Sequence, residues 1–231
     1  MIIPRAVVFD LDGTLLHTLP DIASSCNHAL SLFGLPTLPD DEVMRYVGNG
    51  ARELLYSASR LKDDDPRLDR IVDEYIRHYQ SHPVVLTEWM PHARDAIEQL
   101  SSMPLAICSN KPRSITDRIL HTLRVEERFA VIVGGGDTTR PKPSPDALRF
   151  AAAKLRVDPG ELVMVGDGPQ DVLCGRAAGA RTVAISNGYS PEAFLRELRP
   201  DMLLKDLHAL PDVVIRWTKT TVAARRSFHP E

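Results

Sequence analysis

The sequence predicts an α/β protein with a doubly wound parallel sheet and a helical domain inserted after the first strand. Two observations predict the fold class: short continuous apolar runs recur along the chain, and amphipathic stretches with helical spacing separate them. Continuous apolar strands are typical of a parallel sheet that helices cover on both faces. A third observation predicts the insertion, because about ninety residues without a convincing strand follow the first run, far more than a crossover helix needs.

The elements follow in order from these patterns. Strands are expected at six apolar runs, 5–10, 104–110, 130–135, 162–167, 181–186 and 201–206. Helices of the core are expected at 91–101, 112–124, 145–156 and 169–179, with proline near their starts and Gly179 ending the last. Helices of the insertion are expected at 21–33, 40–46, 51–60 and 66–81, the last with apolar residues at three- and four-residue spacing.

These elements divide the chain into three parts. Residues 1–16 and 86–217 form the predicted α/β core, and residues 17–85 form a helical cap domain. A helical domain inserted at this point would lie over the carboxyl ends of the strands, where such sheets bind ligands, and would act as a lid. Residues 218–231 lack clear periodicity and are expected to be a flexible C-terminal tail.

Composition restricts the class of partner and the compartment. The formal net charge of −3 provides no general attraction for nucleic acid or anionic membranes, and no run of about 18 apolar residues predicts a membrane span. A small molecule is therefore the expected partner. Three widely spaced cysteines predict neither disulfides nor a zinc site, which favours a cytoplasmic protein. Nothing in the sequence chooses between a monomer and a homodimer.

Polar side chains lie where four of the predicted strands end, and the carboxyl ends of parallel strands share one edge of a sheet. We therefore expect three groups to converge with Lys142: Asp10, Asp12 and Thr14 after the first strand, Ser109 and Asn110 after the second, and Asp167 and Asp171 after the fourth. Such an acidic cluster needs compensating cations. Lys142 is one, and a divalent ion bound by oxygen ligands, for which Mg²⁺ is suited, is the other.

Each motif also has a purely structural interpretation. Asp12-Gly13 and Asp167-Gly168 are common turn pairs, and Ser109-Asn110 could cap a helix. Lys142, in a proline-rich loop, could be a surface lysine. Only the occurrence of all these motifs at successive strand ends favours a functional site.

The same motifs resemble those of a known superfamily. DLDGTLL at 10–16, Ser109 after an apolar strand, Lys142 in KPSP and GDGPQD at 166–171 are similar to the four motifs of the haloacid dehalogenase superfamily, in the expected order. The resemblance covers positions 7 to about 190. It implies a phosphatase rather than a dehalogenase, because the dehalogenase branch lacks the second acid, Asp12.

The resemblance also implies roles for the residues. Asp10 would be the nucleophile that forms an aspartyl-phosphate, and Asp12 the general acid and base. Asp10, the backbone carbonyl of Asp12, and Asp167 would bind Mg²⁺, while Asp171 would support the metal through water or Lys142. Lys142 would balance the charge at Asp10. Ser109 would contact the phosphoryl oxygens, and Thr14 and Asn110 are further expected substrate contacts.

The expected cap carries a clue to the substrate. In VGNGA, Gly50 permits a close backbone approach, and Arg52 in the next helix could pair with a small anion, although this stretch could also be a plain turn between helices. VGNGA, LPDI at 19–22 and GGGDTTRPKPSPDAL at 134–148 resemble bacterial phosphoglycolate phosphatases. His17 and Gly168 depart from that pattern, which commonly has Asp and Ser at these positions.

Alternatives to 2-phosphoglycolate hydrolysis remain. Related phosphatases act on other sugar phosphates or on pyrophosphate. A phosphomutase would use the same two acids, but its typical Thr-His-Arg-like cap segment is absent. A phosphonate-cleaving enzyme would need a cap lysine, and the one present, Lys62, lies in an acidic, solvated stretch. A non-enzymatic phosphoacceptor module would be about half as long and would carry its acceptor on a middle strand.

Overall fold

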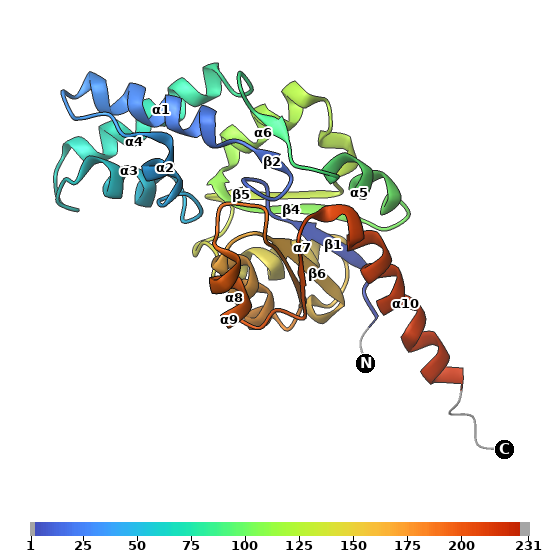
Figure 1. Cartoon of the computed structure of the whole chain (residues 1–231). Helices are drawn as coiled ribbons and strands as arrows, with labels where there is room; N and C mark the ends of the chain where they lie inside the picture. The colour runs from blue at the N-terminus through green and yellow to red at the C-terminus, as the bar shows by residue number, and fades with distance from the viewer. Residues whose placement is uncertain (1–2, 227–231) are drawn as a thin grey trace.

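The computed structural model describes residues 3–226, with side chains up to residue 219. Six strands form one parallel sheet in the order β5-β4-β1-β6-β7-β8 (Figure 1). Their bounds are β1 Ala6–Phe9, β4 Leu105–Pro112, β5 Val131–Gly135, β6 Leu162–Gly166, β7 Arg181–Ile185 and β8 Met202–Leu204. Every pair is parallel, and β1 lies between β4 and β6. The predicted fold class is confirmed, and β1 carries Asp10 to the middle of the sheet's carboxyl edge.

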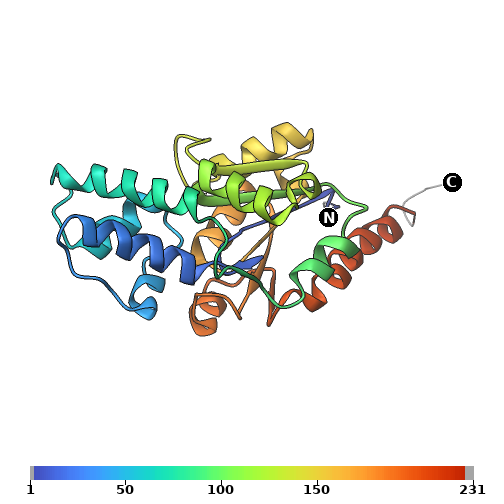
Figure 2. The same cartoon turned by 90° about the horizontal axis from the view of Figure 1, so that it is seen from above.

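Helices cover both faces of the sheet because each β-strand directs alternate side chains to opposite sides. Val7 and Phe9 of β1 belong to the core cluster that contains the buried residues of α5 Ala93–Gln99, α6 Arg113–Leu123 and α10 Leu210–Arg226. Ala6 and Val8 belong to the opposite cluster, with α7 Asp146–Leu155 and α8 Pro169–Ala178. Figure 2 shows the same layers from above, after a turn of 90° about the horizontal axis. The short helix α9 Glu192–Glu197 was not expected from the sequence.

Residues 19–81 form four helices beside the carboxyl edge of the sheet (Figure 1), and we call this segment the helical insertion. Its helices are α1 Leu19–Leu32, α2 Asp40–Met44, α3 Ala51–Ser59 and α4 Arg67–Ser81. The expected spacing in α4 corresponds to its buried face, which includes Leu68, Ile71, Tyr75 and Tyr79. All four predicted helices therefore form within about two residues of their expected bounds.

Two short strands join the insertion to the core. β2 Leu16–His17 pairs antiparallel with β3 Glu88–Trp89, so both crossings of the chain run side by side. Asp21, buried in α1, strengthens this junction by accepting hydrogen bonds from the backbone N–H groups of Val85, Leu86 and Thr87 at 2.9–3.1 Å. Two-residue strands are too short to produce a periodic signal, which is why the sequence did not predict them.

The C-terminal part of the chain differs from its expectation. Helix α10 continues to Arg226, so residues 218–226 of the expected tail are helical, while 227–231 lie outside the described residues. The remaining elements are three 3₁₀ helices, Glu126–Arg128, Pro159–Glu161 and Leu207–Ala209. Within the described part of the chain, no helix is both long enough and apolar enough to cross a membrane.

Candidate active site

Three carboxylates converge where β1 and β6 end. Asp10 directly follows β1, Asp167 directly follows β6, and Asp171 lies in the first turn of α8. Each offers an oxygen within 4.8 Å of the others, and all three side chains are buried. The sequence predicted that these strand ends lie together at one edge of the sheet, and the structure brings their carboxylates together. Such proximity of like charges in a buried site requires compensation.

Lys142 provides the first compensating charge. Its ammonium lies 2.9 Å from Asp10 Oδ1 and 2.5 Å from Asp171 Oδ1, and it donates a hydrogen bond to the carbonyl of Cys108 at 2.7 Å. The side chain is almost fully buried. Burial alone would lower the pKa of Lys142, but Asp10 and Asp171 outweigh it and hold that pKa well above its ordinary value. The ammonium is therefore a permanent cation beside Asp10.

Asp167 is oriented by two donors. The Thr14 hydroxyl donates to its Oδ1 at 2.7 Å, and the Tyr189 backbone N–H donates to its Oδ2 at 2.7 Å. Gly13, with φ +80°, allows this close packing, since a Cβ there would lie 2.5 Å from Asp167 Oδ2. Burial, followed by the charges of Asp10 and Asp171, raises the pKa of Asp167 to about 8. Thr14, expected to contact substrate, instead holds this carboxylate.

This cluster fits a divalent cation. Three buried carboxylates meet one ammonium, which leaves an excess of negative charge. After burial, this excess is the second cause of the raised pKa of Asp167. Asp10 Oδ1 is buried and, although near Lys142, accepts no well-directed hydrogen bond from the described residues. Oxygen ligands with no nitrogen or sulfur donor are the set that Mg²⁺ prefers. Asp12 does not belong to the carboxylate cluster, so any contribution from it would come from its backbone carbonyl.

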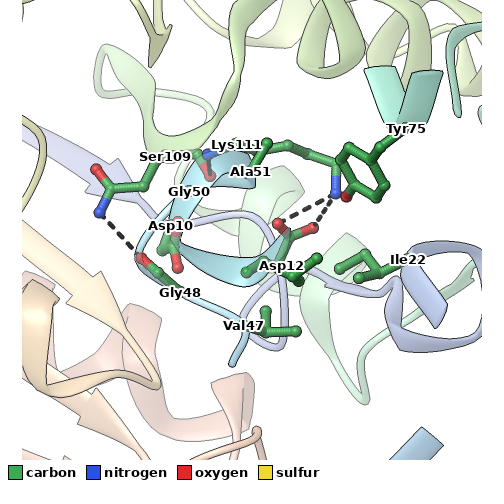
Figure 3. A pocket seen from close by; sticks show the side chains of 12 residues that line it. Asp10, Asp12, Ile22, Val47, Gly48, Gly50, Ala51, Tyr75, Ser109 and Lys111 are labelled. Atoms are coloured by element: carbon green, nitrogen blue, oxygen red, sulfur yellow. Dashed lines mark hydrogen bonds and ion pairs between the residues drawn. The ribbon is translucent and has the colours of Figure 1, made fainter. Parts of the chain in front are cut away.

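The Asp12 carboxylate points to a different cation. Lys111 Nζ donates to Asp12 Oδ1 and Oδ2 at 3.0 and 3.2 Å (Figure 3). The Thr18 hydroxyl also donates to Asp12 Oδ1, at 2.6 Å. Lys111 Nζ also lies 4.3 Å from the centre of the Tyr79 ring, on helix α4 of the insertion. Burial lowers the pKa of Lys111, and Asp12 partly offsets this effect. Asp10 and Asp12 therefore contact different lysines.

Ser109 and Asn110 are buried residues within β4 but have different surroundings. The Ser109 hydroxyl lies at the cavity and accepts a hydrogen bond from the Lys111 backbone N–H at 3.2 Å, so its own proton is available to a ligand. Asn110 donates to the carbonyls of Gly48 and Lys142, both at 2.9 Å, and accepts from the Lys142 N–H at 2.8 Å. Both amide donors of Asn110 are thus used to hold two loops, not to contact substrate.

A small cavity of about 30 Å³ lies between the catalytic edge and the insertion. Figure 3 shows Asp10, Asp12, Ser109 and Lys111 on its core side. The insertion contributes the opposite wall: Ile22, Val47, Gly48, Gly50, Ala51, Leu54 and Tyr75. The insertion therefore closes over the acidic residues, as a lid would.

The two residues of the insertion that were expected to contact substrate, Gly50 and Arg52, have different surroundings. Gly50, with φ +92°, precedes α3 and lines the cavity close to the carbonyl of Asn110. Arg52 is half exposed and does not line this cavity. Its guanidinium pairs with Asp63 at 2.9 Å and Asp69 at 2.7 Å, both in the insertion. In this structure the Arg52 guanidinium is paired with two carboxylates, and Arg52 lines the larger groove next to this cavity rather than the cavity itself.

Two residues at the site were not singled out from the sequence. Lys111 precedes Pro112 and was interpreted as part of a helix start, although it directly follows the strand-end pair Ser109-Asn110. Tyr189 follows β7, and its hydroxyl accepts hydrogen bonds from the N–H groups of Thr18 and Leu19 at 2.8 and 3.0 Å. Applying the strand-end rule to β7 would have indicated the Tyr189 segment.

Comparison with known proteins agrees with this geometry. The chain is 34% identical over 212 residues to the phosphoglycolate phosphatase of Neisseria meningitidis, covering 88% of this chain and 90% of that protein. It is 33% identical over 216 residues to the N-acetylmuramic acid 6-phosphate phosphatase of Pseudomonas aeruginosa, covering 92% and 95%. The crystal structure of a "predicted phosphoglycolate phosphatase" from Haemophilus somnus superposes with a TM-score of 0.83 at 26% identity, covering 91% and 97%. The model of the haloacid dehalogenase-like hydrolases matches residues 7–185, and the chain belongs to that family.

Proposed function

We propose that this protein is a Mg²⁺-dependent phosphatase that hydrolyses a small phosphate monoester through an aspartyl-phosphate on Asp10, with 2-phosphoglycolate as the favoured substrate. One observation carries the proposal. Asp10 lines a small cavity and has the Lys142 ammonium 2.9 Å away, while Asp12, also at the cavity, is held separately by Lys111 and Thr18. Two neighbouring carboxylates in different environments can take different chemical roles.

The reaction would proceed in two displacements. A carboxylate oxygen of Asp10 attacks phosphorus, the ester P–O bond breaks, and Asp12 gives its proton to the departing alkoxide oxygen. Water then attacks the phosphorus of the aspartyl-phosphate, Asp12 takes the proton of that water, and the acyl-phosphate P–O bond breaks. Inorganic phosphate leaves, and Asp10 is restored as a carboxylate.

The remaining residues stabilise charge during these steps. Lys142 lies where it can offset negative charge on the transferring phosphoryl group, and the Ser109 hydroxyl can donate to one of its oxygens. Asp10, Asp167 and the backbone carbonyl of Asp12 would hold Mg²⁺, with Asp171 supporting the site through Lys142 or water. When bound, the metal would supply positive charge that neutralises phosphoryl oxygens.

Two observations bear on which ester is the substrate. The relatives named phosphoglycolate phosphatase favour 2-phosphoglycolate. The cavity at Asp10, about 30 Å³, is smaller than any phosphate ester and does not choose between esters. A larger groove of about 560 Å³ adjoins it, shares Gly50, Ala51, Ser109 and Asn110 with it, and is also lined by Gly134, Gly135 and Gly136. A sugar phosphate could extend into this groove, so a sugar 6-phosphate is the second candidate substrate.

The proposal is tested by measuring phosphate release with Mg²⁺ from 2-phosphoglycolate, N-acetylmuramic acid 6-phosphate, glucose 6-phosphate, pyrophosphate and p-nitrophenyl phosphate. We expect multiple turnovers, with 2-phosphoglycolate giving the highest kcat/KM. Asp10→Asn should lower kcat by about three orders of magnitude or more, because the amide is a poor nucleophile.

Asp64→Asn is the matched control, since Asp64 is exposed on the insertion, and it should retain full activity. Equal activity of Asp10→Asn and the parent would contradict the assignment of Asp10 as the nucleophile. Isomerisation of a sugar phosphate without net phosphate release would indicate a mutase, and one phosphate per chain would indicate a phosphoacceptor. If 2-phosphoglycolate is among the poorest esters, the proposed substrate is wrong.

The proposed setting is the cytoplasm. Cys26, Cys108 and Cys174 are all free and buried, as expected in a reducing compartment. Burial raises the pKa of Cys26 to about 12 and that of Cys174 to about 11, so these thiols are not reactive.

A further inference from the structure

The geometry points to Lys111 as the residue that selects substrates with a second anionic group, in particular a carboxylate attached to the carbon that bears the phosphorylated hydroxyl. This inference rests on the proposed phosphatase function and deepens it. The evidence is that Lys111, whose ammonium is buried beside Asp12, lines the cavity, and that no other described residue lining this cavity carries a positive charge.

Lys111 is held at the cavity from several sides. Its side chain is only 2% exposed, and its ammonium donates to both oxygens of Asp12. The ring of Tyr79, 4.3 Å from Nζ, packs on it from the insertion. An ammonium has three N–H donors, and Asp12 is its only hydrogen-bond partner among the described residues. At least one donor therefore remains for a ligand.

Apart from Asp10 and Asp12, the described residues that form the rest of the cavity wall are uncharged. Ile22, Val47, Ala51 and Leu54 form an apolar surface on the side of the insertion. Among the described residues that line the cavity, Lys111 is the only one with a positive charge. Lys142 lies behind Asp10, outside the lining, and its ammonium is engaged by Asp10, Asp171 and the Cys108 carbonyl.

The proposed reaction fixes where the organic part of the substrate lies. Asp12 must contact the departing ester oxygen, and Lys111 Nζ is within 3.2 Å of both Asp12 oxygens. A group one or two bonds beyond that ester oxygen therefore lies next to the ammonium. A carboxylate placed there would gain a charge-assisted hydrogen bond, whereas a neutral group would leave the buried ammonium less well satisfied.

A purely structural role for Lys111, that of orienting Asp12, makes a different prediction. Orientation of Asp12 affects every ester alike, because each needs the same proton at its leaving oxygen. Recognition of a second anion affects only the esters that carry one. A pair of substrates that differ in this group alone therefore separates the two roles.

The test compares 2-phosphoglycolate with 2-hydroxyethyl phosphate, in which a neutral hydroxymethyl group replaces the carboxylate. For the unmodified protein we expect kcat/KM to be at least about tenfold higher for 2-phosphoglycolate, given the strength of hydrogen bonds to charged groups. Lys111→Met should raise KM for 2-phosphoglycolate by roughly ten- to a hundredfold and bring the ratio of the two substrates close to one. Lys111→Arg should retain a preference, because the positive charge remains.

Lys62→Met removes an exposed lysine of the insertion and should leave the ratio unchanged. A Lys111→Met protein that loses activity on both esters equally, with the ratio intact, would overturn the inference. Circular dichroism and the melting temperature show whether that variant is folded. If it is not, the ratio in Lys111→Gln decides by the same criterion.

Binding measurements distinguish a failure of this inference from a failure of the proposed function. Calorimetry with Asp10→Asn and with the Asp10→Asn, Lys111→Met double variant measures the affinity of both esters without hydrolysis. Preference for 2-phosphoglycolate that depends on Lys111, in a parent protein that releases no phosphate from any ester, would support the inference and contradict the phosphatase proposal. Hydrolysis of both esters with no such preference would overturn the inference alone.

Discussion

Asp10 and Asp12 are separated by one residue, yet each contacts its own lysine. Asp10 lies beside Lys142, and Asp12 beside Lys111. Two neighbouring carboxylates repel each other, and here each carboxylate has its own ammonium group as a counter-charge. The sequence predicted one lysine and one metal ion as the compensating charges. The second lysine was not predicted, because Lys111 comes directly after the predicted strand at 104–110 and is followed by proline, which is typical of a helix start. In the structure, β4 extends through Lys111.

Asp167 provides a prediction at the residue scale. Its pKa is about 8 in the folded, metal-free protein and near 3.8 when unfolded. The folded state thus binds more protons than the unfolded state between these values, and stability falls as pH rises through this window. We expect the melting temperature of the metal-free protein to fall between pH 5.5 and pH 8.5. Added Mg²⁺ should raise it more at pH 8.5 than at pH 5.5.

Asp167→Asn is the control for this titration, because an amide carries no charge at either pH. The variant should show a flatter dependence of melting temperature on pH, and it should respond little to Mg²⁺. An identical pH dependence in parent and variant would show that Asp167 does not titrate in this range. Thermal denaturation with and without a chelator provides all of these measurements.

At the scale of elements, the junction between core and insertion depends on one buried side chain. Asp21 in α1 accepts backbone hydrogen bonds from residues 85–87 and one from the Thr87 hydroxyl at 2.7 Å. These bonds attach the returning crossing, next to β3, to the first helix of the insertion. The sequence predicted α1 itself, but the partners of Asp21 are more than 60 residues away and no local pattern indicates them.

Asp21→Ala should lower the free energy of unfolding by about 1–3 kcal/mol, because it removes the buried acceptor that several part-buried donors of residues 85–87 share. Urea unfolding measures this change. Asp73→Ala is the matched control, since Asp73 is exposed on α4, and it should change stability by less than about 0.5 kcal/mol. Similar losses in the two variants would contradict the role of Asp21.

At the scale of the whole molecule, Asn110 connects the insertion to the core segment that carries Lys142. Its amide binds the Gly48 carbonyl of the insertion and both backbone groups of Lys142. The position of Lys142 is thereby coupled to closure of the insertion over the cavity. The sequence placed Asn110 correctly at a strand end but could not show that loops 62 and 32 residues away would use its amide.

Asn110→Ala should lower kcat/KM for 2-phosphoglycolate by roughly ten- to a hundredfold, because Lys142 loses its fixed position. Hydrogen exchange should increase at residues 46–50. Asn27 offers a matched control, since its amide also makes two backbone hydrogen bonds, to Leu38 within the insertion. Asn27→Ala should lower stability while kcat/KM stays within about twofold. Equal kinetic effects in both variants would indicate only a general loss of stability.

The sequence by itself determined the α/β fold class, the main strands, the four helices of the insertion and four helices of the core, and the strand ends near Asp10, Ser109 and Asp167, but not α9 or α10. These properties depend on periodicity and turn chemistry, which act over a few residues. Only the tertiary structure decided which charge each functional group meets. Lys111 and Asp12 are 99 residues apart, and Arg52 turns to Asp63 and Asp69 instead of the cavity. Such contacts depend on how distant segments pack against one another, which no local pattern encodes.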